Sequence, residues 1–347
     1  MTKPRHVLVF RFSSLGDVAM AVPVIKLLLQ QHTDLQVTMV SAQLMQPLFE
    51  GLERFHFHGA DLTHTHKGIT GLYRLYKDLK KMYAFDAIAD LHDVLRTKLI
   101  RSFFTFSKKP IAVINKGRKE KRQATRQRNK ILRPLKSTFE RYADVFASLA
   151  LPIVLIREGG IIKTVVAEDM FLLKQRGHSL IGIAPFAQYV EKMYPIAKMK
   201  EVLRLLLQHS KLKIFLFGGK DDAPLLQQWE VEFPGVESMA AKMSFQKELQ
   251  AIAQLDLMVS MDSANMHFAS LYGVPVISVW GGTHPWLGFY GWGQPETNVV
   301  QVDLECRPSS VFGDKLCPRE DLACMNLISP IMIYDKIMKE LNKDLSN

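Results

Sequence analysis

The feature of this 347-residue sequence that most limits its fold is a regular alternation of short apolar runs with longer helical patterns. Buried β-strands are predicted to begin at His6, Leu35, Phe85 and Pro110, and helical stretches separate them. Strands that alternate with helices in this way form a parallel sheet with crossover helices. We therefore expect the first part of the chain to be a doubly wound α/β domain.

The same pattern starts again in the second half. Further strands are predicted in 179–186, 213–219, 255–262 and 275–282, with a short strand candidate before Met243. The chain is thus expected to form two doubly wound α/β domains with a boundary near 155–175. In such sheets, ligands bind at the carboxyl ends of the strands, and every motif described below lies at a predicted strand end.

Composition limits the class of protein. Hydrophobic residues make up 48% of the chain and charged residues 23%, which is typical of a globular protein. Arg11 interrupts the first apolar run, so no secretory signal is expected, and no stretch of about 18 apolar residues predicts a membrane span. Three cysteines predict no disulfide framework, and the expected location is a reducing cytoplasm. The formal net charge of +11 favours anionic partners.

The first motif, RFSSLGDVAMAVPVI, follows the first predicted strand. Ser13, Ser14 and Gly16 can present backbone N–H groups and hydroxyls to an anion. Asp17 lies at the start of the next helix, where its carboxylate can accept a proton from a substrate hydroxyl. The alternative is that Asp17 is simply the N-cap of that helix. Pro23 is expected to break or kink the helix.

Two motifs of the second half contain further candidates. In APFAQYVEKMYP, Lys192 is the only cation and suits a diphosphate, although most single lysines are solvated surface residues. In LFGGKDDAP, Asp221 or Asp222 can cap the next helix or hydrogen-bond a ribose. Met243, in AKMSF, is more often a core residue than a base-stacking one, and Ser244 is expected to cap a helix.

The most informative motif is SMDSANMHFASLYGVPVISVWGGTHP, which begins at Ser260. Asp262 ends a strand and Ser263 can start a helix, whose first backbone N–H groups form a ready anion site. His267 is four residues beyond Ser263 and therefore lies on the same helix face. A G-G-T turn follows the next strand at Thr283. A lone histidine is usually structural, but a D-S-x-x-x-H helix start at a strand end, followed by a G-G-T turn, is a less common arrangement.

Taken in order, RFSSLGD, EKMYP, AKMS and the 260–285 motif resemble the successive motifs of the ADP-heptose:lipopolysaccharide heptosyltransferases, glycosyltransferase family 9. The resemblance extends from residue 8 to about 328. It implies a GT-B fold, in which two Rossmann-like domains face each other across a cleft. We expect an acceptor-binding domain in 1–165 and a nucleotide-sugar-binding domain in 166–328. A final helix in 329–347, opened by Ser329 and Pro330, can pack back on the N-terminal domain.

The resemblance also implies roles for individual residues. Asp17 would be the general base on the acceptor hydroxyl, and Lys192 would neutralise the diphosphate leaving group. Gln188 stands where the family has a phosphate-contacting hydroxyl, which is a departure. Met243 matches the methionine near the adenine, and Asp222 is a further candidate for the nucleotide sugar.

The stretch Asp262, Ser263, Ala264 and His267 matches the part of the family that holds ribose and phosphates, although Ala264 replaces a frequent glycine. Together these roles imply an inverting enzyme that moves a heptose from ADP-heptose to an inner-core lipopolysaccharide acceptor of the Kdo-lipid A type. No D-x-D pair is present in the sequence. We therefore expect metal-independent transfer without a cofactor.

A basic segment, 108–136, contains twelve Lys or Arg residues and one acidic residue, Glu120. We expect it to be a flexible loop or solvated helix of the N-terminal domain, where it would meet an anionic, lipid-linked saccharide acceptor. A peripheral contact with the cytoplasmic face of the inner membrane is a further expectation. The alternative is a solvated charge run without a partner. Nucleic-acid binding is not expected, because aromatic residues are not interleaved with the cations.

Cys306, Cys317 and Cys324 lie close together in the sequence but include no C-x-x-C pair, so we expect reduced structural thiols and no metal site. Two alternative functions remain. The first is a transferase of the same fold that uses another nucleotide sugar or acceptor, which the Gln188 and Ala264 departures allow. The second is a non-enzymatic binder of anionic membrane or nucleic acid through the basic segment.

Overall fold

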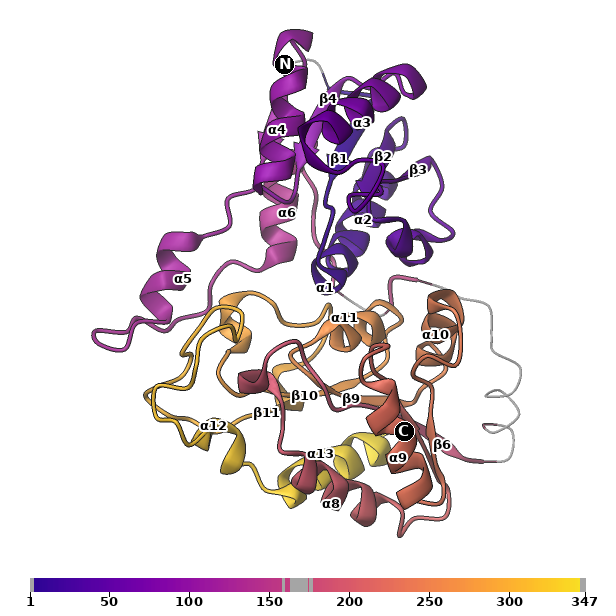
Figure 1. Ribbon diagram of the computed structural model, residues 1–347, viewed down its shortest axis with the longest axis vertical. Coiled ribbons are helices and arrows are strands. Elements are labelled where there is room, and N and C mark those ends of the chain that lie inside the picture. The colour runs from indigo at the N-terminus through magenta and orange to yellow at the C-terminus, as the bar shows by residue number, and fades with distance from the viewer. Residues whose placement is uncertain (1–2, 158–159, 163–173, 175–176, 344–347) are drawn as a thin grey trace. The chain divides into compact units, whose positions relative to one another are not determined.

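The computed structural model describes residues 3–157, 160–162, 174 and 177–343, and it divides into two compact units (Figure 1). The first unit comprises Met1–Lys116 and Lys136–Arg157. The second unit comprises Gly117–Leu135 and Glu158–Asn347. The boundary expected between residues 165 and 166 lies outside the described residues.

The first unit is built on a parallel sheet with the strand order β3-β2-β1-β4-β5. The central strand pairs in parallel with β2 on one side and with β4 on the other. All four strands expected here are confirmed, whereas β3 was not predicted because its sequence, FHFHG, has no aliphatic side chains. The strands are β1 (His6–Phe10), β2 (Gln36–Ser41), β3 (Phe55–Gly59), β4 (Ala87–Asp90) and β5 (Ile111–Val113).

Helices cover both faces of this sheet because each one turns an apolar stripe toward the buried strands. On one face, Leu75, Leu79, Ile100 and Phe104 from two adjacent helices pack on the sheet. The first predicted helix is divided at Met20, and Pro23 lies in the first turn of the second piece, where proline is tolerated. The α-helices are α1 (Leu15–Ala19), α2 (Ala21–Gln31), α3 (Gly68–Met82), α4 (Leu95–Phe104) and α6 (Thr138–Ala147), with 3₁₀ turns at Gln43–Phe49 and Thr105–Ser107.

The second unit has a parallel sheet with the order β11-β10-β9-β6-β7-β8. Every strand predicted in this half is confirmed; the two-residue β11 was too short to be recognised from its sequence. All strand pairs are parallel, and the chain order of the strands reverses between β6 and β9; ligands bind at the carboxyl strand ends beside such a switch point. The strands are β6 (Ser179–Ala184), β7 (Leu212–Leu216), β8 (Val236–Ser238), β9 (Leu257–Met261), β10 (Val276–Val279) and β11 (Val299–Val300).

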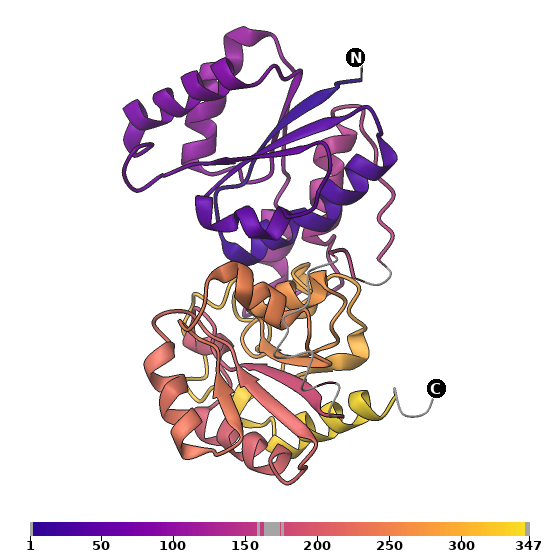
Figure 2. The ribbon, with the colours of Figure 1, turned by 90° about the vertical axis from the view of Figure 1, so that its right-hand side faces the viewer.

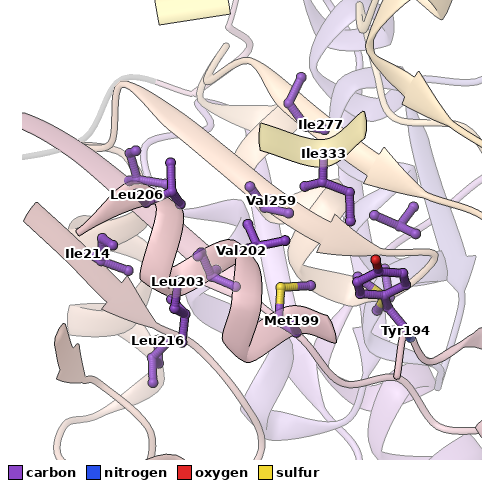
Figure 3. Close-up of a cluster of buried hydrophobic side chains, with 14 of the residues drawn as sticks. Tyr194, Met199, Val202, Leu203, Leu206, Ile214, Leu216, Val259, Ile277 and Ile333 are labelled. Atoms are coloured by element: carbon purple, nitrogen blue, oxygen red, sulfur yellow. The ribbon is translucent and has the colours of Figure 1, made fainter. Parts of the chain in front are cut away.

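Side chains from strands and helices fill one core on a face of the second sheet (Figure 3). Met199 and Val202 from α8 meet Val259 and Ile277 from the strands, and Ile333 from α13 completes the cluster. In the second unit the helices are α5 (Arg118–Ala124), α8 (Ile196–Leu206), α9 (Ala223–Glu232), α10 (Phe245–Ile252), α11 (Ala264–Leu271), α12 (Ala323–Asn326) and α13 (Pro330–Lys343), with 3₁₀ turns at Val190–Lys192, Pro285–Leu287 and Glu296–Asn298.

The last helix does not follow the expectation that it can return to the N-terminal domain. Instead, α13 lies beside α8 and against β9 and β10 of the second unit (Figure 2). Burial of Ile333 and Ile337 in that core explains the difference, because the apolar stripe of the helix is already satisfied there. Its predicted start is confirmed, since Met332 N donates to Ser329 Oγ at 3.3 Å.

The basic segment also differs from its expected place. Its central part, Gly117–Leu135, belongs to the second unit and not to the N-terminal one. Lys121 is buried, with Nζ 3.9 Å from the centre of the Phe289 ring, and Leu135 N donates to the carbonyl of Trp286. The sequence showed the charges but not these two contacts, the Phe289 ring and the Trp286 carbonyl, which lie far along the chain. None of the helices in the described residues combines the length and apolar character that a bilayer span requires.

Candidate functional site

The first group of candidate residues lies where β1 ends in the first unit. Asp17 is the third residue of α1, and Ser14, not Asp17, occupies the N-cap position. The Asp17 carboxylate forms an ion pair with the Arg11 guanidinium and accepts a hydrogen bond from Ser14 Oγ at 2.9 Å, both through Oδ2. The N-cap interpretation of Asp17 is therefore wrong, and its carboxylate is held by a cation and a hydroxyl.

Arg11 reaches Asp17 from inside the unit, because it is buried directly after β1. Arg11 Nη1 donates to the carbonyl of Leu91 at 2.9 Å, and the Tyr142 hydroxyl donates to the Asp17 carbonyl at 3.1 Å. Burial opposes the Arg11 charge, but the neighbouring Tyr142 and Asp17 outweigh it and raise the pKa of Arg11 above its ordinary value. The guanidinium is thus a permanent buried cation beside Asp17.

Ser13 and Ser14 are exposed and Gly16 is half-buried, so the loop they form is accessible at the carboxyl end of β1. His92 lies at the end of the adjacent β4 and accepts a hydrogen bond from Phe12 N at 3.3 Å. Burial, together with the charges of Arg11 and Lys116, lowers the pKa of His92 to about 3. His92 is therefore neutral at physiological pH and supports the loop without adding charge.

The second group lies in the second unit, where three adjacent strands end. Lys192 follows β6, Asp262 follows β9 and Thr283 follows β10. Lys192 Nζ is 3.0 Å from Asp262 Oδ2, and Thr283 Oγ1 donates to the same oxygen at 2.8 Å. The side chains of Lys192 and Asp262 are only 14% and 10% exposed, so this polar cluster is nearly enclosed. One carboxylate oxygen therefore joins all three strand ends.

Backbone contacts hold the loops that carry this cluster. Gly282 N donates to the Glu191 carbonyl at 2.9 Å, which ties the G-G-T turn to the loop of Lys192. The buried Arg307 donates to the carbonyls of Gly281 and Thr283, at 2.5 and 3.0 Å. Burial lowers the pKa of Arg307 to about 10, which still leaves it charged at neutral pH. Arg307 thus braces both sides of the turn with a charged hydrogen-bond donor.

The opening of α11 lies beside Asp262. Ser263 is the N-cap residue with an extended backbone, and its own side chain makes no capping bond to the helix. Ser263 and Ala264 are half-buried, whereas His267, on the next turn, is buried. Unsatisfied N–H groups at a helix start favour an anion. Lys192 lies beside this helix start, paired with Asp262, and His267 lies on the next turn of α11.

Three further candidates lie in other loops of the second unit. Asp222 is the N-cap residue of α9, and its Oδ2 accepts a hydrogen bond from Gly219 N at 2.8 Å, which closes the glycine turn. Met243 is half-buried immediately before Ser244, whose hydroxyl caps α10 as predicted. Gln188 is exposed. The structure does not join these three to the Lys192–Asp262 cluster through any contact among the described residues.

The three cysteines are free thiols. Cys324 is buried, and burial raises the pKa of its thiol, whereas Cys306 and Cys317 are half-buried. Within the described residues, no three His, Cys, Asp or Glu side chains are grouped as ligands of a metal ion. Cys306 directly precedes Arg307, and Cys324 lies in α12.

Sequence reasoning missed Arg11, His92, Tyr142 and Arg307. One signal was present, since an arginine immediately after a fully apolar strand must find a carboxylate if it is buried. The other residues gave no signal, because their partners are backbone groups brought near by the fold: carbonyls for Tyr142 and Arg307, and an N–H group for His92. Thr283 was noted only as part of a turn, and its bond to Asp262 depends on the order of the strands.

A comparison with family models matches the heptosyltransferase family, glycosyltransferase family 9, over residues 72–318, which is more than half of the chain. The chain belongs to glycosyltransferase family 9. The matched region contains Lys192, Asp262 and Thr283, whereas Asp17 precedes it.

Two curated proteins are similar in sequence, both named lipooligosaccharide heptosyltransferase 2 and both from Campylobacter jejuni. One, from strain 81116, is 23% identical over 175 residues, which cover 48% of this chain and 53% of the relative. The other, from strain ATCC 700819, is 23% identical over 183 residues, which cover 51% of this chain and 54% of the relative. The chain thus spans about half the length of the curated relatives it matches.

Several solved structures are similar to this chain over almost its whole length. A glycosyltransferase family 9 protein of Veillonella parvula superposes with a TM-score of 0.75 at 15% identity and covers 98% of each chain. The ADP-heptose lipopolysaccharide heptosyltransferase II of Escherichia coli superposes with a TM-score of 0.69 at 14% identity, over 98% of this chain and 99% of that one. Escherichia coli heptosyltransferase WaaC, solved with ADP, gives a TM-score of 0.67 at 17% identity over 96% and 99%. The expected GT-B fold with two Rossmann-like units is confirmed.

Proposed function

We propose that this chain is an inverting, metal-independent glycosyltransferase that moves a heptose from ADP-heptose to a lipopolysaccharide inner-core acceptor. Its family and the names of its relatives support heptosyl transfer. The solved structures of WaaC with ADP and with an ADP-heptose analogue support the same donor here. The observation that carries the proposal is the enclosed Lys192–Asp262–Thr283 cluster beside the start of α11.

The donor would be held at this cluster through its diphosphate. Lys192 supplies positive charge, and the N–H groups at Ser263 and Ala264 supply hydrogen-bond donors that point out of the helix. His267, one turn further along α11, is placed to assist. Gln188, Asp222 and Met243 would contact the nucleotide from the flanking loops. Thr283 and Arg307 would hold the loops in place.

Asp17 would act on the acceptor. Its carboxylate takes the proton of the acceptor hydroxyl while that oxygen forms a bond to the anomeric carbon. The bond from this carbon to the diphosphate oxygen breaks in the same step, so the anomeric centre is inverted and ADP leaves with the electron pair. Arg11 and Ser14 both hold Oδ2 of Asp17, which fixes the orientation of the base. Ser13 and Gly16 would contribute to an anion-binding loop for the acceptor.

The acceptor is proposed to be an anionic, lipid-linked saccharide of the Kdo-lipid A type. Exposed cations of the basic segment, such as Arg126, Arg128 and Arg133, suit such an acceptor. We place the reaction on the cytoplasmic side of the inner membrane. The domain roles stay as proposed from the sequence, with the acceptor on the first unit and the donor on the second.

Calorimetric titration with ADP, UDP and GDP in EDTA tests the donor. Preference for ADP without metal is the expected outcome. Preference for UDP or GDP would move the function to another nucleotide sugar, for which the exposed Gln188 leaves room. A folded sample that binds no nucleotide would overturn the enzymatic proposal.

The base is tested separately with Asp17→Asn. We expect ADP release in the presence of acceptor to fall at least about 100-fold, whereas ADP affinity and the melting temperature stay close to those of the wild type. Asp34→Asn is the matched control, because Asp34 is an exposed carboxylate of the same unit that pairs only with Lys3 among the contacts of the described residues. Equal losses in both variants would remove Asp17 from the mechanism.

A further inference from the structure

One outer surface of the first unit combines exposed apolar side chains with a dense set of cations. It lies on α3, whose inner residues Leu72, Leu75 and Leu79 are buried against the sheet. On the opposite side Ile69 is 64% exposed and Tyr73 is 46% exposed. Single exposed apolar side chains are common on proteins, but Ile69 and Tyr73 share one side of a helix with several cations.

Helical geometry places these residues on one stripe. Ile69, Tyr73, Lys77 and Lys80 follow a spacing of four, four and three residues, which keeps them on the same side of a helix. All four are exposed. We name them the α3 face. Arg74 and Lys81 flank it and are exposed as well.

Aromatic contacts organise the α3 face. Lys77 Nζ lies 5.3 Å from the centre of the Tyr73 ring, and Tyr73 is stacked on Tyr76 at 5.8 Å. Phe103 of the adjacent α4 meets Tyr73 edge-on at 5.5 Å (Figure 1 shows α3 and α4). Lys80 Nζ is likewise 6.0 Å from the Tyr76 ring. The rings are thus packed together, and cations lie directly beside them.

Acidic charge is kept off this stripe. Asp78 is the only acidic residue in the sequence of α3, and its position lies on a different side of the helix from Ile69, Lys77 and Lys80. Asp78 Oδ2 is 3.9 Å from His66 Nε2, so it faces a potential cation of the preceding loop. The α3 face therefore presents a positive charge that no carboxylate of its own helix offsets.

We propose that the α3 face is a docking surface for an anionic phospholipid bilayer. Amphipathic helices that lie in a bilayer interface combine lysines on a polar side with Ile- and Tyr-type side chains that enter the headgroup boundary. Tyrosine, with an apolar ring and a polar tip, suits this boundary. Charge complementarity selects anionic lipid, and the exposed Ile69 and Tyr73 select a surface that can accept apolar side chains.

This assignment differs from the basic segment that the sequence emphasised. Gly117–Leu135 belongs to the second unit and offers exposed Arg126 and Arg128 with one large exposed apolar side chain, Ile131, outside any helix. The α3 face combines exposed cations and exposed apolar side chains on one helix. The proposal concerns membrane docking and does not depend on which sugar is transferred.

Co-flotation of the full chain with vesicles tests the proposal. The wild type is expected to float with vesicles of phosphatidylglycerol and phosphatidylcholine, and not with phosphatidylcholine alone. The double variant Lys77→Gln and Lys80→Gln should weaken binding about 30-fold, because each removed cation near an anionic surface costs about a factor of five. Arg126→Gln with Arg128→Gln is the matched control, since it removes the same net charge from exposed positions.

Ile69→Asn provides a second, uncharged test. Ile69 is exposed, so the variant should fold normally while losing the binding that remains in high salt. Equal losses in both double variants would assign binding to net charge alone and overturn the proposal. Loss only in the Arg126 and Arg128 variant would also overturn it. Failure of the wild type to bind vesicles would do the same, and an acidic protein would then be the better partner for the α3 face.

Discussion

Lys192 and Asp262 form an ion pair, with Nζ 3.0 Å from Oδ2, although the sequence motifs assign them to different parts of a ligand. Because Thr283 also donates to this oxygen, the carboxylate is fixed from two sides. Asp262 therefore orients the side chain of Lys192, in addition to its place in the motif that leads into α11. A diphosphate at Lys192 would share the cation with Asp262, so substitutions around the pair should alter affinity for ADP.

Lys192→Gln should weaken ADP binding about 10- to 100-fold, since a charged hydrogen bond contributes about 1.5–3 kcal/mol. Calorimetric titration measures this loss. Lys211→Gln is the control, because Lys211 is an exposed lysine immediately before β7, at the opposite end of the strands. A similar loss in both variants would indicate a general effect of net charge and not a site.

Gly313→Ala should also weaken ADP binding, through Lys192. Gly313 has φ +79°, and a Cβ there would lie 2.5 Å from Cγ and Cδ of Lys192, so the lysine stem must move. Gly235→Ala is a matched control, because Gly235 has φ +100° and its added Cβ would meet only Leu207, at 3.4 Å. Both variants should lose about 1–2 kcal/mol of stability from backbone strain. Only Gly313→Ala should change ADP affinity, and unchanged affinity would contradict the role of this contact.

Thr283→Val tests the hydroxyl that holds Asp262. Thr283 is buried, so loss of its donor should lower the free energy of unfolding by about 1–3 kcal/mol and weaken ADP binding several-fold. Thr283→Ser keeps the hydroxyl and loses a methyl group. We expect it to lose stability without losing affinity. If thermal melts and titrations of the two variants change in parallel, packing alone accounts for Thr283.

Stability of the first unit should fall in acid because of His92. Its folded pKa is about 3, whereas a histidine in an unfolded chain has a pKa of about 6.5. Between these values the unfolded chain binds a proton that the folded unit resists, so stability decreases as the pH falls. The slope from one such group is at most about 1.4 kcal/mol per pH unit, and it disappears above about pH 6.5.

Melting temperatures of the wild type and His92→Asn from pH 7.5 to 4.5 measure this contribution. Asparagine can still accept from Phe12 N but does not titrate in this range. The variant should therefore lose less stability in acid than the wild type. Parallel curves would show that other groups account for the acid sensitivity.

The sequence predicted most of the fold because its strands are short, buried and aliphatic. Strand β1, HVLVF, is buried at all five positions and was readily recognised. Strand β3 escaped because histidines alternate with its phenylalanines, and this edge strand needs fewer aliphatic side chains than a central one. Caps at Ser244 and Ser329 followed the expected chemistry, since they depend on local bonds.

Tertiary relationships were harder to predict. The motifs contained Asp17, Lys192 and Asp262, but the sequence did not indicate that Thr283 would donate to Asp262, because this bond depends on the order of the strands. The local pair of Arg11 with Asp17 had a signal, a buried arginine directly after an apolar strand, which was not used. The placement of 117–135 involves one ring and one backbone carbonyl much further along the chain, so charge pattern alone could not reveal it.

That placement affects how the protein can be divided. The chain leaves the first unit after Lys116, returns at Lys136 and leaves again after Arg157, so no single cut separates the units. A fragment that ends at Arg157 would carry Lys121 and Leu135 without Phe289 and Trp286, their partners. A chimera that exchanges the second unit between relatives would therefore need to transfer 117–135 together with the second half. Residues 117–135 lie in the first half of the sequence but pack on residues of the second half. We therefore expect the two to change together in evolution.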